Sequence, residues 1–169
     1  REFDVVVAVG PSRDDTAARI DAWATRDPRV RRVDNPSGTT PAALNRAIAE
    51  STGDLVVRVD AQAVVPEGYL QRLLDSAGRT GAGNVGGLQR PVGAGGWSTP
   101  IAAAMRSSFG VGPAQFRSGG HEGPTDTVYL GAFRRAALEE VGGYDETLIR
   151  NQDYELNWRL RQAGYVIWL

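Results

Sequence analysis

The sequence predicts an α/β fold in which a mostly parallel central sheet is flanked by helices. Short runs of β-branched residues, typical of buried strands, alternate with segments whose apolar residues recur at helical spacing. Caps, prolines and glycines mark most of the borders between these segments. Strands that alternate with helices in this way are usually parallel and joined by crossovers. At 169 residues, of which 41% are hydrophobic, the chain suits a single domain over 1–169.

The first half predicts three strands and three helices. Thr40-Pro41 places a capping residue before a proline, which is a strong helix start. Asp27-Pro28 ends the helix before it, and Pro66 opens the helix that follows the third strand. The strands are expected at residues 3–9, 29–33 and 54–60, and the helices at residues 17–24, 40–52 and 66–77.

The second half is richer in glycine and less regular. Its expected strands are residues 84–88, 126–133 and 166–169, and its expected helices are residues 98–105, 134–141 and 151–163. Residues 109–125 form a long, weakly patterned segment between two of these elements. Loops of such length in a compact domain are usually functional or mobile.

Composition excludes several classes of function. The net charge of −1 provides no basic field for nucleic acid and no polybasic cluster for a membrane surface. The chain lacks cysteine and has one histidine, so a metal would be held by oxygen ligands, which favours Mg or Mn. No apolar stretch approaches the ~20 residues that span a bilayer, and no signal peptide is visible. The expected location is therefore cytoplasmic.

Two acidic residues are candidates for chemistry. Asp60 ends the third predicted strand, and ligands of open α/β sheets bind beyond the carboxyl ends of strands. Its carboxylate could hold a cation or a sugar hydroxyl, or it could simply cap the turn. Asp153 lies in the first turn of a predicted helix, where the helix dipole stabilises a carboxylate. That alone would make Asp153 a poor base, unless burial or a neighbouring carboxylate raised its pKa.

Five segments, in this order, resemble the motifs of family 2 glycosyltransferases, which are inverting enzymes with the GT-A fold. Residues 57–62, V-R-V-D-A-Q, occupy the place of the D-x-D motif. Residues 151–156, N-Q-D-Y-E-L, resemble the E-D motif helix. The matching segments are residues 5–16, 43–48, 57–62, 131–145 and 151–165. The R-V-D-A-x-A form of residues 58–63 is similar to that of the bacterial branch that builds exopolysaccharide, including succinoglycan-type enzymes.

The resemblance implies a role for particular residues. Asp153 would be the general base that deprotonates the acceptor hydroxyl. The donor-binding residues would be Asp60, Ser12, Asp14 and Arg58. The residues next to the base, Gln152 and Tyr154, would contact the acceptor, and Asp60 with Gln62 would hold a weakly bound Mg or Mn ion. Residues 1–80 would form the nucleotide-sugar half, and residues 81–169 the acceptor-binding half, with a mixed sheet.

The same resemblance implies the partners. The donor would be a nucleoside-diphosphate sugar, most simply of the UDP type, and the acceptor a carbohydrate or a lipid-linked sugar of cell-surface or exopolysaccharide synthesis. The family's first strand would precede Arg1, so we expect a fragment. Longer relatives carry membrane helices, which would place the full-length protein at the cytoplasmic face of the inner membrane.

Departures from the family pattern leave alternatives open. Gln62 stands where the second metal-binding Asp is expected, and Gly10-Pro11 replaces an Asp-Gly pair. A degenerate or truncated domain that binds nucleotide or a partner without turnover is therefore the second hypothesis. An unrelated nucleotide-binding α/β module ranks last, because no G-x-G-x-x-G follows the first strand and the chain has no P-loop lysine. The enzyme hypothesis requires Asp60 and Asp153 to converge.

Overall fold

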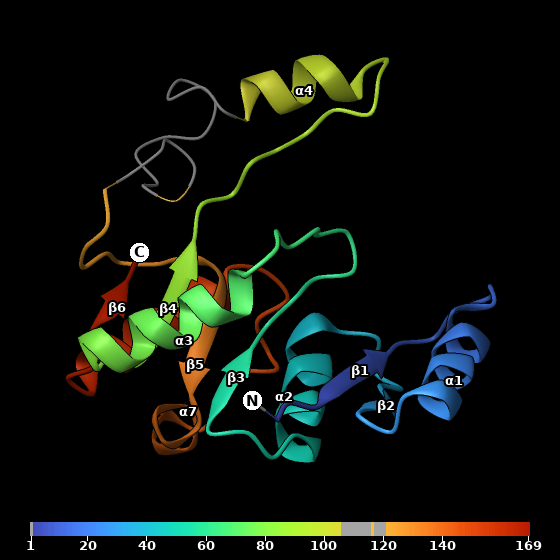
Figure 1. Ribbon diagram of the computed structural model, residues 1–169, viewed down its shortest axis with the longest axis horizontal. Helices are drawn as coiled ribbons and strands as arrows, with labels where there is room; N and C mark the ends of the chain where they lie inside the picture. The colour runs from blue at the N-terminus through green and yellow to red at the C-terminus, as the bar shows by residue number, and fades with distance from the viewer. Residues whose placement is uncertain (1, 106–115, 117–120) are drawn as a thin grey trace.

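The protein is an α/β structure built from two neighbouring sheets and their helices (Figure 1). The computed structural model describes residues 2–105, 116 and 121–169. The elements follow in the order β1 (Val5–Val9), α1 (Thr16–Arg26), β2 (Val30–Asp34), α2 (Thr40–Glu50), β3 (Leu55–Val57), α3 (Tyr69–Thr80), β4 (Asn84–Gly87), α4 (Ser98–Ala104), β5 (Tyr129–Arg134), α7 (Arg135–Val141), α8 (Gln152–Gln162) and β6 (Ile167–Trp168). Much of the long predicted segment 109–125 lies outside the described residues.

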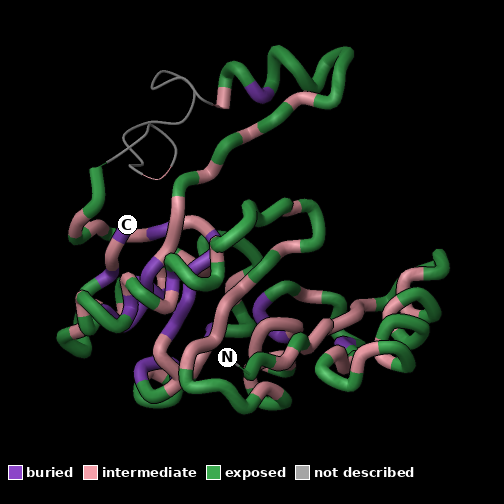
Figure 2. The backbone as a smooth tube through the Cα atoms, in the orientation of Figure 1, coloured by how far each residue is buried: buried purple, intermediate pink, exposed green. Residues whose placement is uncertain are grey.

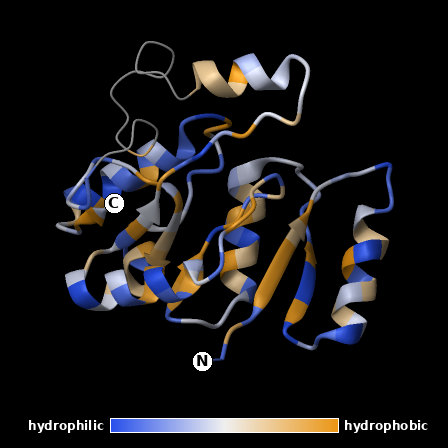
Figure 3. Cartoon of the chain, turned by 45° about the horizontal axis from the view of Figure 1, so that its top comes forward, coloured by the Kyte–Doolittle hydropathy of each residue, from blue (hydrophilic) through white to orange (hydrophobic). Residues whose placement is uncertain are grey.

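The first sheet confirms the predicted parallel crossover. β1 and β2 pair in parallel from Val5 opposite Val30 to Val9 opposite Asp34, with α1 connecting them. Figure 3 shows that β1 is apolar along its length, whereas β2 carries two arginines in its middle. Figure 2 shows no buried position in α1, and most buried positions lie around the second sheet. The first sheet is therefore the more open part of the molecule.

The second sheet is mixed and has the order β3-β5-β4-β6. β5 runs antiparallel to both β3 and β4, while β4 and β6 are parallel. This agrees with the mixed second half that the sequence predicts. In the described residues no backbone pairing joins β1 or β2 to β3, so the parallel strands belong to two sheets.

Each face of the second sheet carries its own core, because successive strand residues point to opposite faces. In β5, Phe133 packs with Leu156 and Leu160 of α8, whereas its neighbour Ala132 packs with Leu73 of α3. All five of these side chains are at most 5% exposed. The sheet is thereby held between α8 on one face and α3 on the other, which fixes the position of α8.

The third predicted strand is shorter than expected. β3 ends at Val57, and Arg58 makes one further ladder bond through its amide to the carbonyl of Gly131, at 3.1 Å. Val59 is 50% exposed. The β-branched run therefore continues past the point where the neighbouring strand supports it. Asp60 consequently lies in the loop after β3 rather than at the last position of the strand.

α4 stands apart from both sheets at the end of an extended segment (Figure 1). Trp97, directly before it, is 86% exposed, and Ile101 within it is 56% exposed. Within residues 2–105 and 121–169, no helix has the length and apolar character of a membrane-spanning segment.

A buried polar chain links the second sheet to α8. The Asn84 amide donates to the Asn157 Oδ1 atom at 2.7 Å, and the Asn157 amide donates to the Thr127 hydroxyl at 2.9 Å. Asn84 and Asn157 are at most 1% exposed. Gly131 makes room for this chain, because a Cβ atom there would lie 2.3 Å from the Asn84 Oδ1 atom and 2.8 Å from a ring carbon of Phe133.

We therefore expect Gly131→Ala to destabilise the protein by about 1–3 kcal/mol, since overpacking would displace a buried amide. Urea unfolding should show a lower midpoint with an unchanged slope. The matched control is Gly78→Ala in α3, where an added Cβ meets nothing within 4 Å. That control should raise stability by about 0.5–1 kcal/mol, because glycine weakens helix interiors. Equal midpoints for Gly131→Ala and the unchanged protein would show that Asn84 has room to move.

Candidate functional site

Arg58 brings together the two acids that the sequence singles out. Its Nε atom donates to Asp60 Oδ1 at 2.7 Å, and its Nη2 atom donates to Asp60 Oδ2 at 3.2 Å. Its Nη1 atom donates to Asp153 Oδ1, across a separation of 95 residues in the sequence. The predicted convergence of Asp60 and Asp153 is therefore found, with one guanidinium between them.

The three charged groups differ in exposure. The Arg58 side chain is 10% exposed, while the side chains of Asp60 and Asp153 are 25% and 44% exposed. The arginine is thus more deeply buried than either carboxylate, and both carboxylates remain partly exposed to solvent. The Asp60 carboxylate accepts from Arg58, whereas the turn bond from the Ala63 amide goes to the backbone oxygen of Asp60. This arrangement argues against the turn-capping interpretation, because the side chain takes no part in the turn bond.

The surroundings of Asp153 counteract the effect of the helix start on its pKa. Burial raises the pKa of Asp153 above its ordinary value, the positive charge of Arg58 opposes this rise, and the negative charge of Asp60 adds to it. The net shift is upward. These are the two influences, burial and a neighbouring carboxylate, that a base in this position needs. A raised pKa strengthens the carboxylate as a proton acceptor.

Tyr144 forms the buried floor of the acidic pair. It is 4% exposed, and its ring meets Phe133 edge to face, with the ring centroids 6.2 Å apart. Burial, followed by the charge of Asp153, raises the pKa of Tyr144, so the hydroxyl is protonated at neutral pH. This hydroxyl interacts with the charge of Arg58 but makes no hydrogen bond of ordinary geometry with the described residues.

Asn45 of α2 makes hydrogen bonds to the backbone of Tyr144, and this contact was not predicted. The Tyr144 amide donates to Asn45 Oδ1, and the Asn45 amide donates to the Tyr144 carbonyl, both at 2.8 Å. A second bond from the Asn45 amide reaches Glu146 at 3.0 Å. The signal in the sequence was an asparagine beside the apolar stripe of a helix, which does not by itself name a partner.

Ser12 and Asp14 stay within their own loop after β1. The Ser12 hydroxyl donates to Asp14, which also accepts from the Thr16 amide at 3.0 Å at the start of α1. The hydrogen bond from Ser12, with those from Thr16, lowers the pKa of Asp14 to about 2. None of the hydrogen bonds in the described chain links this loop to Asp60 or Asp153, so a donor contact by Ser12 and Asp14 stays a prediction.

The remaining predicted site residues lie around the acidic pair. Gln62 is exposed in the loop after Asp60. Gln152 is half-buried and Tyr154 is 51% exposed, and both flank Asp153 in the first turn of α8. Glu155, two residues after the base candidate, pairs instead with Arg159 at 2.5 Å, as expected from its different direction on the helix.

The residues near Asp60 suit a hard cation with few protein ligands. Mg and Mn prefer oxygen ligands and are commonly bound by one or two carboxylates together with substrate phosphates. Asp60 and Gln62 could supply a carboxylate and an amide oxygen to such an ion. In the part of the chain that the structure describes, no three His, Cys, Asp or Glu side chains are grouped as a metal site. Most ligands would therefore come from the diphosphate and water.

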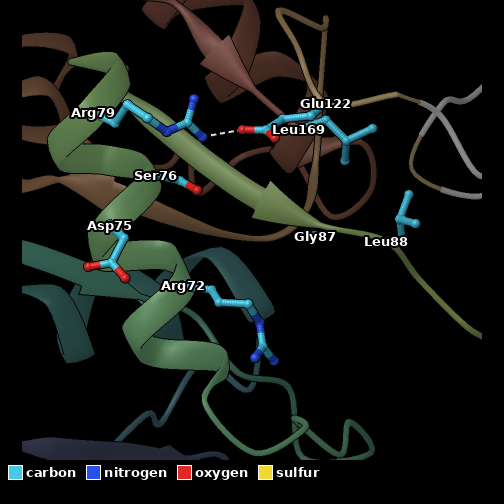
Figure 4. Close-up of a pocket in the computed structure, with 8 residues that line it drawn as sticks. All are labelled: Arg72, Asp75, Ser76, Arg79, Gly87, Leu88, Glu122 and Leu169. Atoms are coloured by element: carbon cyan, nitrogen blue, oxygen red, sulfur yellow. Dashed lines mark hydrogen bonds and ion pairs between the residues drawn. The ribbon is translucent and has the colours of Figure 1, made fainter.

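One surface hollow lies elsewhere, against α3 and the end of β4 (Figure 4). Arg79 reaches across it to Glu122, and Arg72 extends near its other end. The hollow contains neither Asp60 nor Asp153. A sugar-sized cleft around the two acids therefore stays a prediction.

Comparison with known proteins identifies the family of the chain. Residues 1–142 match the family description Glycosyl transferase family 2. The chain is 38% identical over 167 residues to the succinoglycan biosynthesis protein ExoA of Rhizobium meliloti (strain 1021). This match covers 98% of the chain and 51% of that protein, so the chain spans about half the length of the curated relative.

Solved structures share the fold. One is the mannosyltransferase PcManGT from Pyrobaculum calidifontis in complex with GDP-Man and Mn2+, with a TM-score of 0.70, 23% identity, and coverage of 97% of this chain and 44% of that chain. Another is TarS 1-349 of S. aureus, with a TM-score of 0.70, 18% identity, and coverage of 99% and 48%. A complex of the same protein with UDP gives a TM-score of 0.69 at 16% identity. At these identities the likeness confirms the predicted GT-A fold.

Proposed function

Because the chain belongs to glycosyl transferase family 2, we propose that it carries the catalytic residues of an inverting sugar transfer. The donor is a nucleoside-diphosphate sugar, and the acceptor is a carbohydrate or lipid-linked hydroxyl in cell-surface or exopolysaccharide synthesis. The observation that carries the proposal is the meeting of Asp60 and Asp153 at Arg58. Such a pair offers one carboxylate to the donor and one to the acceptor.

The donor is assigned to the side of Asp60. Asp60, Ser12, Asp14 and Arg58 would contact the nucleotide and its diphosphate, with the ribose and phosphates beyond the ends of β1 and β3. UDP is the favoured nucleotide, supported by the UDP complex of a structural neighbour, and GDP is the alternative raised by the GDP-Man complex. Residues 1–80 would then form the donor half and residues 81–169 the acceptor half.

Asp60 and Gln62 would hold a divalent cation, Mg or Mn. When bound, this ion would neutralise the charge that develops on the leaving diphosphate. The neutral Gln62 makes the expected affinity low. The Mn2+ present in the PcManGT structure supports a divalent cation in relatives of this fold.

Asp153 is proposed as the general base. One of its carboxylate oxygens takes the proton of the acceptor hydroxyl while the acceptor oxygen forms a bond to the anomeric carbon. The bond from that carbon to the diphosphate breaks on the opposite side, and its electron pair leaves with the nucleoside diphosphate. Gln152 and Tyr154 flank the base and would orient the acceptor. The reaction would take place in the cytoplasm, at the inner membrane in the natural protein.

Calorimetry on the natural protein tests the donor assignment. UDP and GDP should each be titrated with and without MnCl2, and at least one should give heat that depends on the metal. The absence of metal-dependent heat with both nucleotides would contradict the proposal.

The second candidate is a domain that binds nucleotide or a partner without turnover. The exposed amide of Gln62 in place of a second metal-binding carboxylate favours it. Release of UDP or GDP from UDP-glucose, UDP-galactose or GDP-mannose distinguishes the two, because only an enzyme sustains release. Turnover that requires Asp153 would eliminate the binding-only candidate.

A further inference from the structure

The structure points to a positioning role for Arg58 that extends beyond contact with the donor. Resting on the proposed function, we propose that Arg58 fixes the Asp153 carboxylate relative to the donor site, so that the base is held in place by the same side chain that contacts Asp60. The guanidinium donates from Nε and Nη2 to Asp60 and from Nη1 to Asp153.

The guanidinium is itself held in a largely buried position. It is 10% exposed, next to the buried Tyr144 hydroxyl, and Tyr144 is tied to α2 by the paired bonds to Asn45. A planar guanidinium offers its donors in a rigid fork. Because all three nitrogens of the guanidinium donate to Asp60 or Asp153, its orientation sets where both carboxylates lie.

This arrangement differs from an ordinary surface ion pair. Exposed ion pairs join flexible side chains and contribute little to stability. Here, in contrast, a nearly buried cation contacts two carboxylates from distant parts of the chain. Asp153 is itself 44% exposed, so its side chain would have rotational freedom without the bond from Arg58. Small displacements of a reacting group cost much of the rate.

The test compares Arg58→Lys with the control Arg79→Met in the natural protein. Turnover should be measured with whichever of UDP-glucose, UDP-galactose or GDP-mannose the unchanged protein uses fastest. Lysine keeps the charge but not the fork, so we expect Arg58→Lys to lower kcat on the order of 100-fold, with the donor KM changed about threefold or less. Arg79→Met, on the surface hollow, should leave both constants unchanged. Circular dichroism of each variant reports whether it is folded.

A second measurement separates positioning from a general structural effect. Arg58→Lys should be repeated in an Asp153→Asn background. If Arg58 acts through Asp153, its replacement there should change the residual rate about threefold or less, because residues that act as a unit are not additive. A full loss in both backgrounds, or a higher donor KM with unchanged kcat, would overturn the inference. Failure of the proposed function itself would appear as absent turnover in the unchanged protein or as full turnover in Asp153→Asn.

Discussion

Replacing Asp153 with asparagine is expected to lower turnover on the order of 1,000-fold, within the range that general bases contribute, while nucleotide affinity stays close to that of the unchanged protein. Asparagine keeps the size and one oxygen of the side chain, so Arg58 retains a hydrogen-bond acceptor. It cannot take a proton, and the upward shift in the pKa of Asp153 that suits it to this task is lost with the carboxylate. Release of nucleoside diphosphate and calorimetry with the nucleotide measure the two properties separately.

The matched control for this variant is Asp126→Asn. Asp126 also pairs with an arginine, Arg161, and its side chain is 69% exposed, but among the described residues it shares no ion pair with Arg58. The control should keep its turnover. If Asp153→Asn and Asp126→Asn were equally active, Asp153 would not be the base.

Replacing Asp60 with alanine is expected to weaken binding of the nucleotide and Mn2+ roughly 10- to 100-fold, the range that corresponds to losing a bond between charged partners. Both oxygens of Asp60 face Arg58, so the variant also leaves the arginine with a single carboxylate partner at the site. Turnover should fall together with binding. Calorimetry with UDP or GDP in the presence of MnCl2 measures the change.

Asp75→Ala provides the comparison, because Asp75 lies on α3 at the surface hollow, which contains neither Asp60 nor Asp153. Its loss should not change nucleotide binding. Equal losses of binding in Asp60→Ala and Asp153→Asn would contradict the separation of donor and acceptor roles.

The sequence predicted elements best where local chemistry marks their ends. The Thr40-Pro41 start of α2 and the glycines after α7 are local signals, and both helices begin within one residue of the expected positions, although the cap of α2 is Thr39 and not Thr40. The strand before Asp60 was predicted too long, because a β-branched run reads as strand even after its neighbour in the sheet ceases to support it. Only the structure shows where β5 stops pairing with β3.

The site was predictable in part. The ordered motifs identified Asp60 and Asp153 through resemblance, but their convergence depends on how α8 packs against the second sheet. The bridging position of Arg58 and the bonds between Asn45 and Tyr144 join segments about 95 or more residues apart, which no local pattern encodes. The resemblance assigned Arg58 to the donor alone, and its bond to Asp153 was not predicted.

The buried asparagines also constrain the orientation of the proposed base, Asp153. Asn157 follows Asp153 by one helical turn, so the two side chains leave α8 from the same side. Rolling the helix about its axis would strand the Asn84 and Asn157 amides without partners, at a cost of about 1–3 kcal/mol for each unsatisfied group. The two buried amides thus fix the rotation of α8 about its own axis, and with it the direction in which the Asp153 side chain leaves the helix one turn earlier.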